Sequence, residues 1–205
     1  MSAMARPRPR VAAAAAATAA AAALALTGCS SSGSSGSGES QLGFVTVKGT
    51  NVSKADPGHR QDAPDISGET LDGAQVKLSD YRGKVVVLNV WGSWCGPCRG
   101  EADDLQRVSE KYKDQGVQFL GINTRDTEKT NAVRFEQEKG VTYPSIFDPA
   151  GTQLLKFPKG SLNPQSIPTT LIVDRDGRLA ARAVGGTVED ALESILQPVV
   201  AEPKQ

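Results

Sequence analysis

Two cysteines spaced three residues apart carry the strongest chemical signal in this chain of 205 residues. Cys95 and Cys98 stand in the run WCGPCRGE at residues 94–101, and the third cysteine is Cys29. A zinc site needs about four ligands, and the chain adds only the lone His59 in a loop-like segment. A purely structural disulfide across so short a loop would contribute only about 2 kcal/mol. The spacing therefore favours a reactive dithiol, with no metal and no other cofactor.

The elements around the dithiol predict how it is activated. Residues 85–91 form an almost continuous apolar run, typical of a strand buried on both faces. A helical pattern follows the dithiol directly, with apolar residues at Ala102, Leu105, Val108 and Tyr112. Cys95 then lies at a helix N-terminus, where free N–H groups and the helix dipole favour its thiolate, and Pro97 in the first turn forfeits no hydrogen bond. We expect Cys95 to attack a substrate disulfide and Cys98 to resolve the mixed disulfide, the reverse assignment being the alternative.

The segments after the dithiol predict an α/β fold. In chain order we expect a strand at 117–123, a weaker helix at 129–139, a short strand near 145–147, a strand at 169–173, a hairpin turn at 174–177, a return strand at 179–184 and a final helix over 188–196. This order predicts a mixed sheet with helices on both faces. Residues 45–47 have strand character but are not assigned, because Asp56, Pro57 and Gly58 soon interrupt the pattern.

The N-terminus has the layout of a secretory signal. Residues 1–28 begin with three arginines and no acidic residue, continue as an Ala-rich apolar run over 11–26, and end in small residues. A transmembrane helix is the alternative, but this run is shorter than the roughly 20 residues needed to span a membrane. The letters LTGC at 26–29 resemble a bacterial lipobox, which predicts a lipid on Cys29. Simple secretion without a lipid is the second alternative.

We expect four parts along the chain. They are a signal peptide at 1–28, a lipid anchor and flexible Ser/Gly-rich linker at 29–61, a globular domain at 62–200 and a tail at 201–205. The tether would hold the domain at the extracytoplasmic face of a bacterial membrane, where disulfides persist. The chain has 23 basic and 23 acidic residues, and no basic patch indicates nucleic-acid binding. We expect a monomer.

Several motifs together resemble the thioredoxin-like proteins of the TlpA/ResA/DsbE branch. The motifs are APD at 63–65, LDG at 71–73, LSDYRGK at 78–84, WGSWCGPCR at 91–99 and IPTT at 167–170. The resemblance covers about residues 62–198 and implies the thioredoxin fold with an N-terminal extension. Residues 124–148 stand where this branch inserts a helix and a strand into the fold.

The resemblance also implies how substrate binds. Residues 167–169 resemble the family's cis-proline loop, which lies against the dithiol and offers backbone groups of Ile167 to an extended substrate. Trp94 adjoins Cys95, whereas we expect Trp91 in the core. The expected substrate-binding residues are Trp94, Gly96, Pro97, Ile167 and Pro168.

Two further positions concern proton transfer. Asn89 stands six residues before Cys95, where thioredoxin carries a buried Asp, and an amide cannot relay a proton as a carboxylate does. Glu101, three residues after Cys98 on the same helical face, matches an acidic residue of this branch. We expect Glu101 to be the acid/base for Cys98; the alternative is an exposed first-turn glutamate favoured by the helix dipole.

The resemblance implies an extracytoplasmic thiol–disulfide oxidoreductase that acts mainly as a reductase. Its partners would be proteins with disulfides or CxxC pairs and a membrane electron donor, and the branch suggests a role in cytochrome c maturation. A disulfide-forming oxidant of the same fold is the first alternative. A peroxiredoxin-like antioxidant protein is the second, although no cysteine stands in the Pro-x-x-x-Thr-x-x-Cys pattern of that family. The third is a lipoprotein that only binds an extended peptide beside Pro168.

Overall fold

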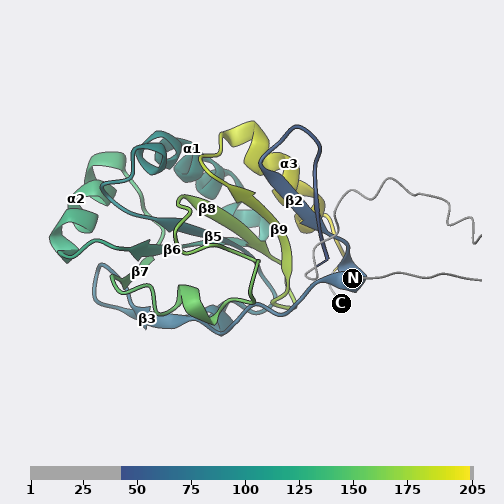
Figure 1. Cartoon of the computed structure of the whole chain (residues 1–205), viewed down its shortest axis with the longest axis horizontal. Coiled ribbons are helices and arrows are strands. Elements are labelled where there is room, and N and C mark those ends of the chain that lie inside the picture. Colours follow the sequence, from purple (N-terminus) through teal and green to yellow (C-terminus); the bar gives the residue numbers. More distant parts are fainter. Residues whose placement is uncertain (1–42, 204–205) are drawn as a thin grey trace, which may run out of the picture. The chain divides into compact units, whose positions relative to one another are not determined.

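A seven-stranded mixed sheet forms the centre of the protein, for which the computed structural model describes residues 43–203 (Figure 1). Its order is β1-β2-β9-β8-β5-β6-β7. The strands are β1 (Phe44–Thr46), β2 (Val52–Ala55), β5 (Val85–Trp91), β6 (Val117–Thr124), β7 (Ser145–Asp148), β8 (Thr169–Val173) and β9 (Leu179–Val184). Strands β5, β6 and β7 are parallel, and the remaining neighbours pair antiparallel.

The other elements cover this sheet. The helices are α1 (Gly96–Tyr112), α2 (Lys129–Lys139) and α3 (Glu189–Val200), with short 3-10 helices at Pro57–His59, Leu78–Tyr81, Lys113–Gln115 and Leu154–Lys156. A separate hairpin consists of β3 (Ser67–Glu69) and β4 (Gln75–Lys77). The predicted mixed α/β fold and the inserted helix and strand, α2 and β7, are confirmed.

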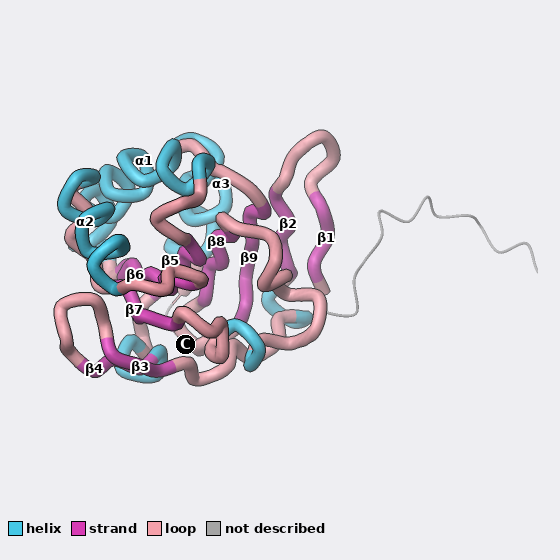
Figure 2. Tube along the Cα trace, turned by 60° about the vertical axis from the view of Figure 1, so that its left-hand side comes forward, coloured by secondary structure: helices cyan, strands magenta, loops and turns pink. Residues whose placement is uncertain are grey.

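The three α-helices lie along one side of the sheet rather than on both sides as expected (Figures 1 and 2). Strand β5 is buried throughout, and its residues alternate between two apolar clusters. Val85 and Val87 pack in the cluster that includes α1 and α3, whereas Val86 and Leu88 belong to the cluster on the other face. That face is covered by the β3–β4 region and by residues 149–167. The apolar run therefore predicted correctly that β5 is buried on both faces. Helices cover one of these faces, and mainly loops and turns cover the other.

The N-terminal boundary of the domain differs from the expectation. Strand β1 pairs with β2, and β2 pairs with β9 at the edge of the main sheet. Phe44 and Ala55 are buried in the core. The predicted flexible linker over 29–61 is therefore wrong from residue 44 onward, and its earlier part lies outside the described residues.

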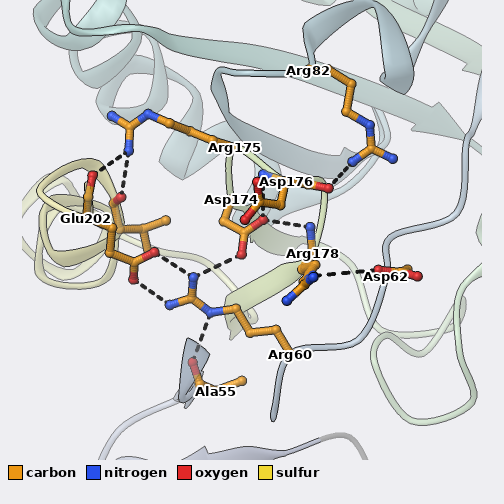
Figure 3. A network of polar contacts seen from close by, with 10 residues as sticks. Ala55, Arg60, Asp62, Arg82, Asp174, Arg175, Asp176, Arg178 and Glu202 are labelled. Atoms are coloured by element: carbon orange, nitrogen blue, oxygen red, sulfur yellow. Dashed lines mark hydrogen bonds and ion pairs between the residues drawn. The ribbon is translucent and has the colours of Figure 1, made fainter. Parts of the chain in front are cut away.

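The C-terminal boundary also differs, because Glu202 of the expected tail is tied to the domain (Figure 3). Arg60 donates from Nη2 to Glu202 Oε1 at 2.6 Å and from Nη1 to Asp174 Oδ2 at 3.0 Å. Arg175 donates to the carbonyl oxygens of Val200, the last residue of α3, and of Glu202 beyond it. This polar cluster closes the end of the sheet where β8 turns into β9.

The dithiol and the cis-proline loop both lie at the opposite end of the sheet. Strand β5 leads there into the dithiol, β6 leads into Arg125 and Asp126, and β8 begins there directly after Pro168. Strand β9 ends there and continues into the loop at 185–187. Among residues 43–203, none of the helices has the length and apolar character needed to cross a membrane.

Candidate active site

A disulfide between Cys95 and Cys98 occupies the N-terminus of α1. The S–S distance is 2.04 Å and the two Cα atoms are 5.3 Å apart. Cys95 is the N-cap residue, and its Sγ accepts a hydrogen bond from the backbone N–H of Cys98 at 3.2 Å. Gly96 and Pro97 follow as the first helical residues. The predicted position at the helix N-terminus is confirmed, and the N–H group that contacts the sulfur is of the kind that stabilises a thiolate after reduction.

The two tryptophans before the dithiol differ in exposure: Trp91 ends β5, and Trp94 lies in the loop that follows. Trp94 is 53% exposed beside Cys95, as expected of a residue that contacts substrate. Trp91 is buried, stacks on Phe135 with ring centroids 4.6 Å apart, and donates from Nε1 to Ser145 Oγ at 3.2 Å. Its expected place in the core is confirmed.

The loop before β8 faces the dithiol as the resemblance implied. The peptide bond between Ile167 and Pro168 is cis, and Ile167 packs against the apolar cluster that contains both cysteines. The carbonyl oxygen of Pro168 accepts a hydrogen bond from the N–H of Gly185 at 2.8 Å. The next residue, Gly186, lies close to Pro97: a Cβ atom added to Gly186 would be 3.7 Å from the Cβ of the proline ring. Two loops far from Cys95 in sequence thus border it.

Glu101 is buried beneath this surface, one helical turn after Cys98. It is 3% exposed, so the alternative of an exposed first-turn glutamate is wrong. Its Oε1 accepts from Asn89 Nδ2 at 2.8 Å, and its Oε2 accepts from the backbone N–H of Thr187 at 2.9 Å. Burial raises the pKa of Glu101 to about 7, although these two hydrogen bonds act to lower it. The carboxyl group can therefore gain or lose a proton near neutral pH.

Asn89 takes part in this site by orienting the carboxyl group. Its Nδ2 also donates to Thr170 Oγ1 at 3.2 Å, so β5 and β8 together fix the amide. The amide cannot transfer a proton, but it can hold Glu101 in place. Thr187 was not predicted from the sequence, where its only signal is its place after two glycines at the end of a predicted strand.

A small cavity of about 10 Å³ lies beside Cys98, lined also by Asn89, Phe135 and Tyr143. That volume accommodates about one water molecule. Burial raises the pKa of Tyr143, and the negative charges of Glu101 and Glu136 raise it further. The phenol therefore stays protonated and is available as a hydrogen-bond donor there.

Neither His59 nor Cys29 is among the residues that the structure places at this site. His59 is exposed in the 3-10 helix after β2, at the other end of the sheet. Cys29, the predicted lipid attachment residue, lies outside the described residues.

The fold and the site define a thioredoxin-fold protein with an exchangeable disulfide at a helix N-terminus. The chain belongs to the AhpC/TSA family, whose sequence model matches residues 59–182. Among curated relatives, the thiol-disulfide oxidoreductase ResA of Geobacillus kaustophilus is 34% identical over 137 residues, which cover 67% of this chain and 75% of the relative.

Solved structures show the same fold. A secreted thiol-disulfide isomerase from Corynebacterium glutamicum is 36% identical with a TM-score of 0.70, and the match covers 77% of this chain and 96% of that one. A DsbF homologue from Corynebacterium diphtheriae is 36% identical with a TM-score of 0.69, covering 78% of this chain and 99% of the other. The protein is thus a thiol–disulfide oxidoreductase of the ResA/DsbE type.

Proposed function

We propose that this protein is a membrane-tethered, extracytoplasmic disulfide reductase. The observation that carries the proposal is the dithiol at the N-terminus of α1 with the carboxyl group of Glu101 buried one turn further on. The N–H group that contacts Cys95 Sγ favours the thiolate of the attacking residue. The nearly buried sulfurs restrict attack to substrates that fit the surface around Trp94 and Pro168.

The reaction transfers two electrons from the reduced protein to the substrate. The Cys95 thiolate attacks one sulfur of a substrate disulfide, which forms a mixed disulfide and releases the other substrate sulfur as a thiol after protonation. The Cys98 thiolate then attacks Cys95 Sγ and releases the second substrate thiol. The protein is left with the disulfide described above, and a membrane donor must supply two electrons and two protons to restore the dithiol.

Glu101 is proposed as the acid/base that serves Cys98. Cys98 must lose its proton before it can attack the mixed disulfide, and a carboxylate whose pKa is about 7 can accept a proton at neutral pH and release it again. A water molecule in the small cavity beside Cys98 would extend this proton path. Asn89 and Thr187 act as positioning residues, because their hydrogen bonds hold the carboxyl group in place.

The reducing direction is supported by the Gly96-Pro97 dipeptide, which stands between the cysteines of thioredoxin as well. Thioredoxin is reducing, at about −270 mV, compared with about −120 mV for the oxidant DsbA. The second candidate is a disulfide-forming or isomerising protein, favoured by the relative from C. glutamicum that is described as a thiol-disulfide isomerase. All of these use the same two cysteines: an oxidant passes electrons in the opposite direction to a reductase, and an isomerase transfers no net electrons.

The location and the substrates complete the proposal. The lipobox-like residues 26–29 support a lipid anchor on Cys29, and relatives described as secreted support a place outside the cytoplasm. Substrates would be proteins with disulfides or CxxC pairs, among them the CxxCH cysteines of apocytochrome c before haem attachment.

The reduction potential of the Cys95–Cys98 pair tests the direction. Equilibration with glutathione or dithiothreitol buffers should give a value well below −180 mV, and a clearly higher value would favour the oxidant. The substrates can be captured with Cys98→Ser, which leaves the mixed disulfide on Cys95 unresolved. Cys95→Ser is the matched control, because it removes the attacking sulfur and should capture nothing through the dithiol.

A further inference from the structure

The residue that follows β6 has an unusual backbone conformation. Arg125 has a φ of 58°, and it is the only non-glycine residue with a positive φ among residues 43–203. A large side chain is rarely found in this region, and such conformations persist where the surroundings enforce them, often at binding sites. The N–H of Arg125 donates to the carbonyl oxygen of Pro149 at 3.2 Å, which helps to hold the turn.

The next residue, Asp126, fixes this turn to the loop before the dithiol. Its Oδ2 accepts from the backbone N–H of Ser93 at 2.8 Å, and its Oδ1 accepts from Ser93 Oγ at 2.5 Å. Asn123 Nδ2 also donates to Oδ2, at 2.7 Å. Asp126 is 3% exposed. The two loops are therefore locked together at Ser93, directly beside Trp94 and Cys95.

Arg125 stacks on the exposed tryptophan of the site as a result of this clamp. Its Cζ lies 4.7 Å from the centre of the Trp94 ring, the geometry of a cation–π contact. Gly92 permits the tryptophan to fold back over the loop, because a Cβ there would come 2.9 Å from Trp94 Nε1. A guanidinium group is thus held at the rim of the dithiol by a stacked ring and an enforced backbone.

This guanidinium group has no carboxylate partner within the described part of the chain. Asp126 is adjacent, but its carboxylate is already bound by Ser93 and Asn123. Arg99, by comparison, is paired with Glu138 at 3.3 Å. A guanidinium offers five N–H donors in a planar fork that matches a carboxylate. The position is therefore suited to an anionic group that arrives with the substrate.

We propose that Arg125 is a specificity-determining residue that binds a carboxylate side chain flanking the reacting cysteine of the substrate. Trp94 supplies the apolar floor beneath that side chain and fixes the direction of the guanidinium. The inference rests on thiol–disulfide exchange at Cys95 and holds for either direction of electron flow, so it does not depend on the potential of the pair.

The test uses short peptides that carry one cysteine joined by a disulfide to 2-mercaptoethanol. Asp, Asn or Lys is placed in turn at each of the two positions on either side of that cysteine. The reduced protein should react about three- to fivefold faster with Asp than with Asn at one or more of these positions. Arg125→Gln should bring the rate with the Asp peptides down to the rate with the Asn peptides, and high salt should reduce the preference in the unmutated protein.

Two matched variants distinguish a specific contact from general charge. Arg134→Gln removes an exposed arginine of α2 that lines a hollow with Ser93, and Lys84→Gln removes an exposed charge just before β5, at the far end of the sheet. Both should keep the preference for Asp. If Arg125→Gln is unfolded, Arg125→Gly replaces it, since glycine suits the positive φ.

Three outcomes overturn the inference while leaving exchange activity intact. The first is a preference for Asp that survives in Arg125→Gln or is absent at every position. The second is a loss of preference in Arg134→Gln equal to that in Arg125→Gln. The third is a rate with neutral peptides that falls as far as the rate with Asp peptides, which would assign Arg125 to activation of Cys95. No reaction of the unmutated protein with any peptide would instead contradict exchange activity itself, and the inference with it.

Discussion

The two ends of the central sheet each bury a carboxylate, and they stabilise it in different ways. Asp174 at one end lies 3.0 Å from a guanidinium nitrogen of Arg60, and the two side chains are 8% and 5% exposed. Glu101 at the other end accepts hydrogen bonds only from the amide of Asn89 and the backbone of Thr187. One acid therefore has a positively charged partner, and the other has neutral donors alone.

This difference separates a structural role from a chemical one. Burial acts to lower the pKa of Arg60, but its hydrogen bonds to Glu202 and Asp174 outweigh burial and raise it. Arg60 thus stays charged at every physiological pH and joins Asp174 at the end of β8 to Glu202 beyond α3. Burial raises the pKa of Glu101 to about 7, so its charge changes within the physiological range. A carboxyl group without a cation is less firmly ionised, which is the property a proton-transfer group needs.

The largest effect should come from breaking the charged cluster with Arg60→Ala. Asp174 and Glu202 would then lose their cation, and removal of one member of a buried ion pair typically costs about 3–5 kcal/mol. Urea denaturation should show a loss near the lower value, because Glu202 is 30% exposed. Arg178→Ala is the control, since its Nε lies 3.9 Å from Asp62 on an exposed surface and should cost less than about 0.5 kcal/mol. Equal losses in both variants would contradict the distinction.

The second-largest effect should be on the pH dependence of the free energy of unfolding, and it comes from Glu101. Its pKa is about 7 in the folded protein against an ordinary value of 4.5. Its contribution is therefore fully present below pH 4.5 and is lost as the pH rises through 7, on the order of 3 kcal/mol. Denaturation of the oxidised protein at several pH values should show Glu101→Gln gaining on the unmutated protein by this amount between pH 4 and pH 8. A constant difference would show that Glu101 titrates normally.

The same substitution should also slow thiol–disulfide exchange, and this effect on the activation free energy is smaller than the effect on stability. Glu101→Gln keeps the shape of the side chain but cannot accept a proton, so resolution by Cys98 should slow by about 10- to 100-fold at neutral pH. Stopped-flow measurement of mixed-disulfide decay gives this rate. Glu136→Gln is the matched control, because burial raises the pKa of Glu136 to about 7 as well, but this residue lies on α2. A comparable loss in that variant would argue against a specific role for Glu101.

The smallest predicted effect comes from adding a second carboxyl group beside Glu101. Asn89→Asp would place it next to Glu101 Oε1, where the amide nitrogen now lies at 2.8 Å. Two carboxylates at such a distance cannot both ionise readily, so the upper apparent pKa of the pair should rise above 7 by about one unit. The pH profile of Cys98 reactivity measures this shift. Thr170→Val, which removes the other hydrogen-bond partner of Asn89, should leave the profile near its original position.

The sequence predicted the parts of the site that depend on neighbouring residues. The dithiol, the helix that begins beneath it and the strand before it are set by spacing and periodicity within a few residues. Glu101 could be placed on the helical face of Cys98 for the same reason. Its burial could not be predicted, because the group that covers it, Thr187, lies 86 residues further along the chain.

The same limit explains the missed elements at the other end. Strand β1 has three residues and β2 has four, too few for a clear alternation, and their pairing depends on β9 more than 100 residues later. The contact between Arg60 and Glu202 spans 142 residues. No local pattern distinguishes such residues from those of a solvated linker or tail.

The course of β1 determines where the chain enters the domain. Phe44 pairs with Ala55 at the end of the sheet that holds Arg60, so the chain enters the domain at the pole opposite the dithiol. Strand β5 alone, at about 3.3 Å per residue, separates the two poles by roughly 20 Å. A tether of the kind proposed above would therefore be attached away from the redox face and would leave that face uncovered. Substrate and electron donor would share this one face, so they could occupy it only in turn.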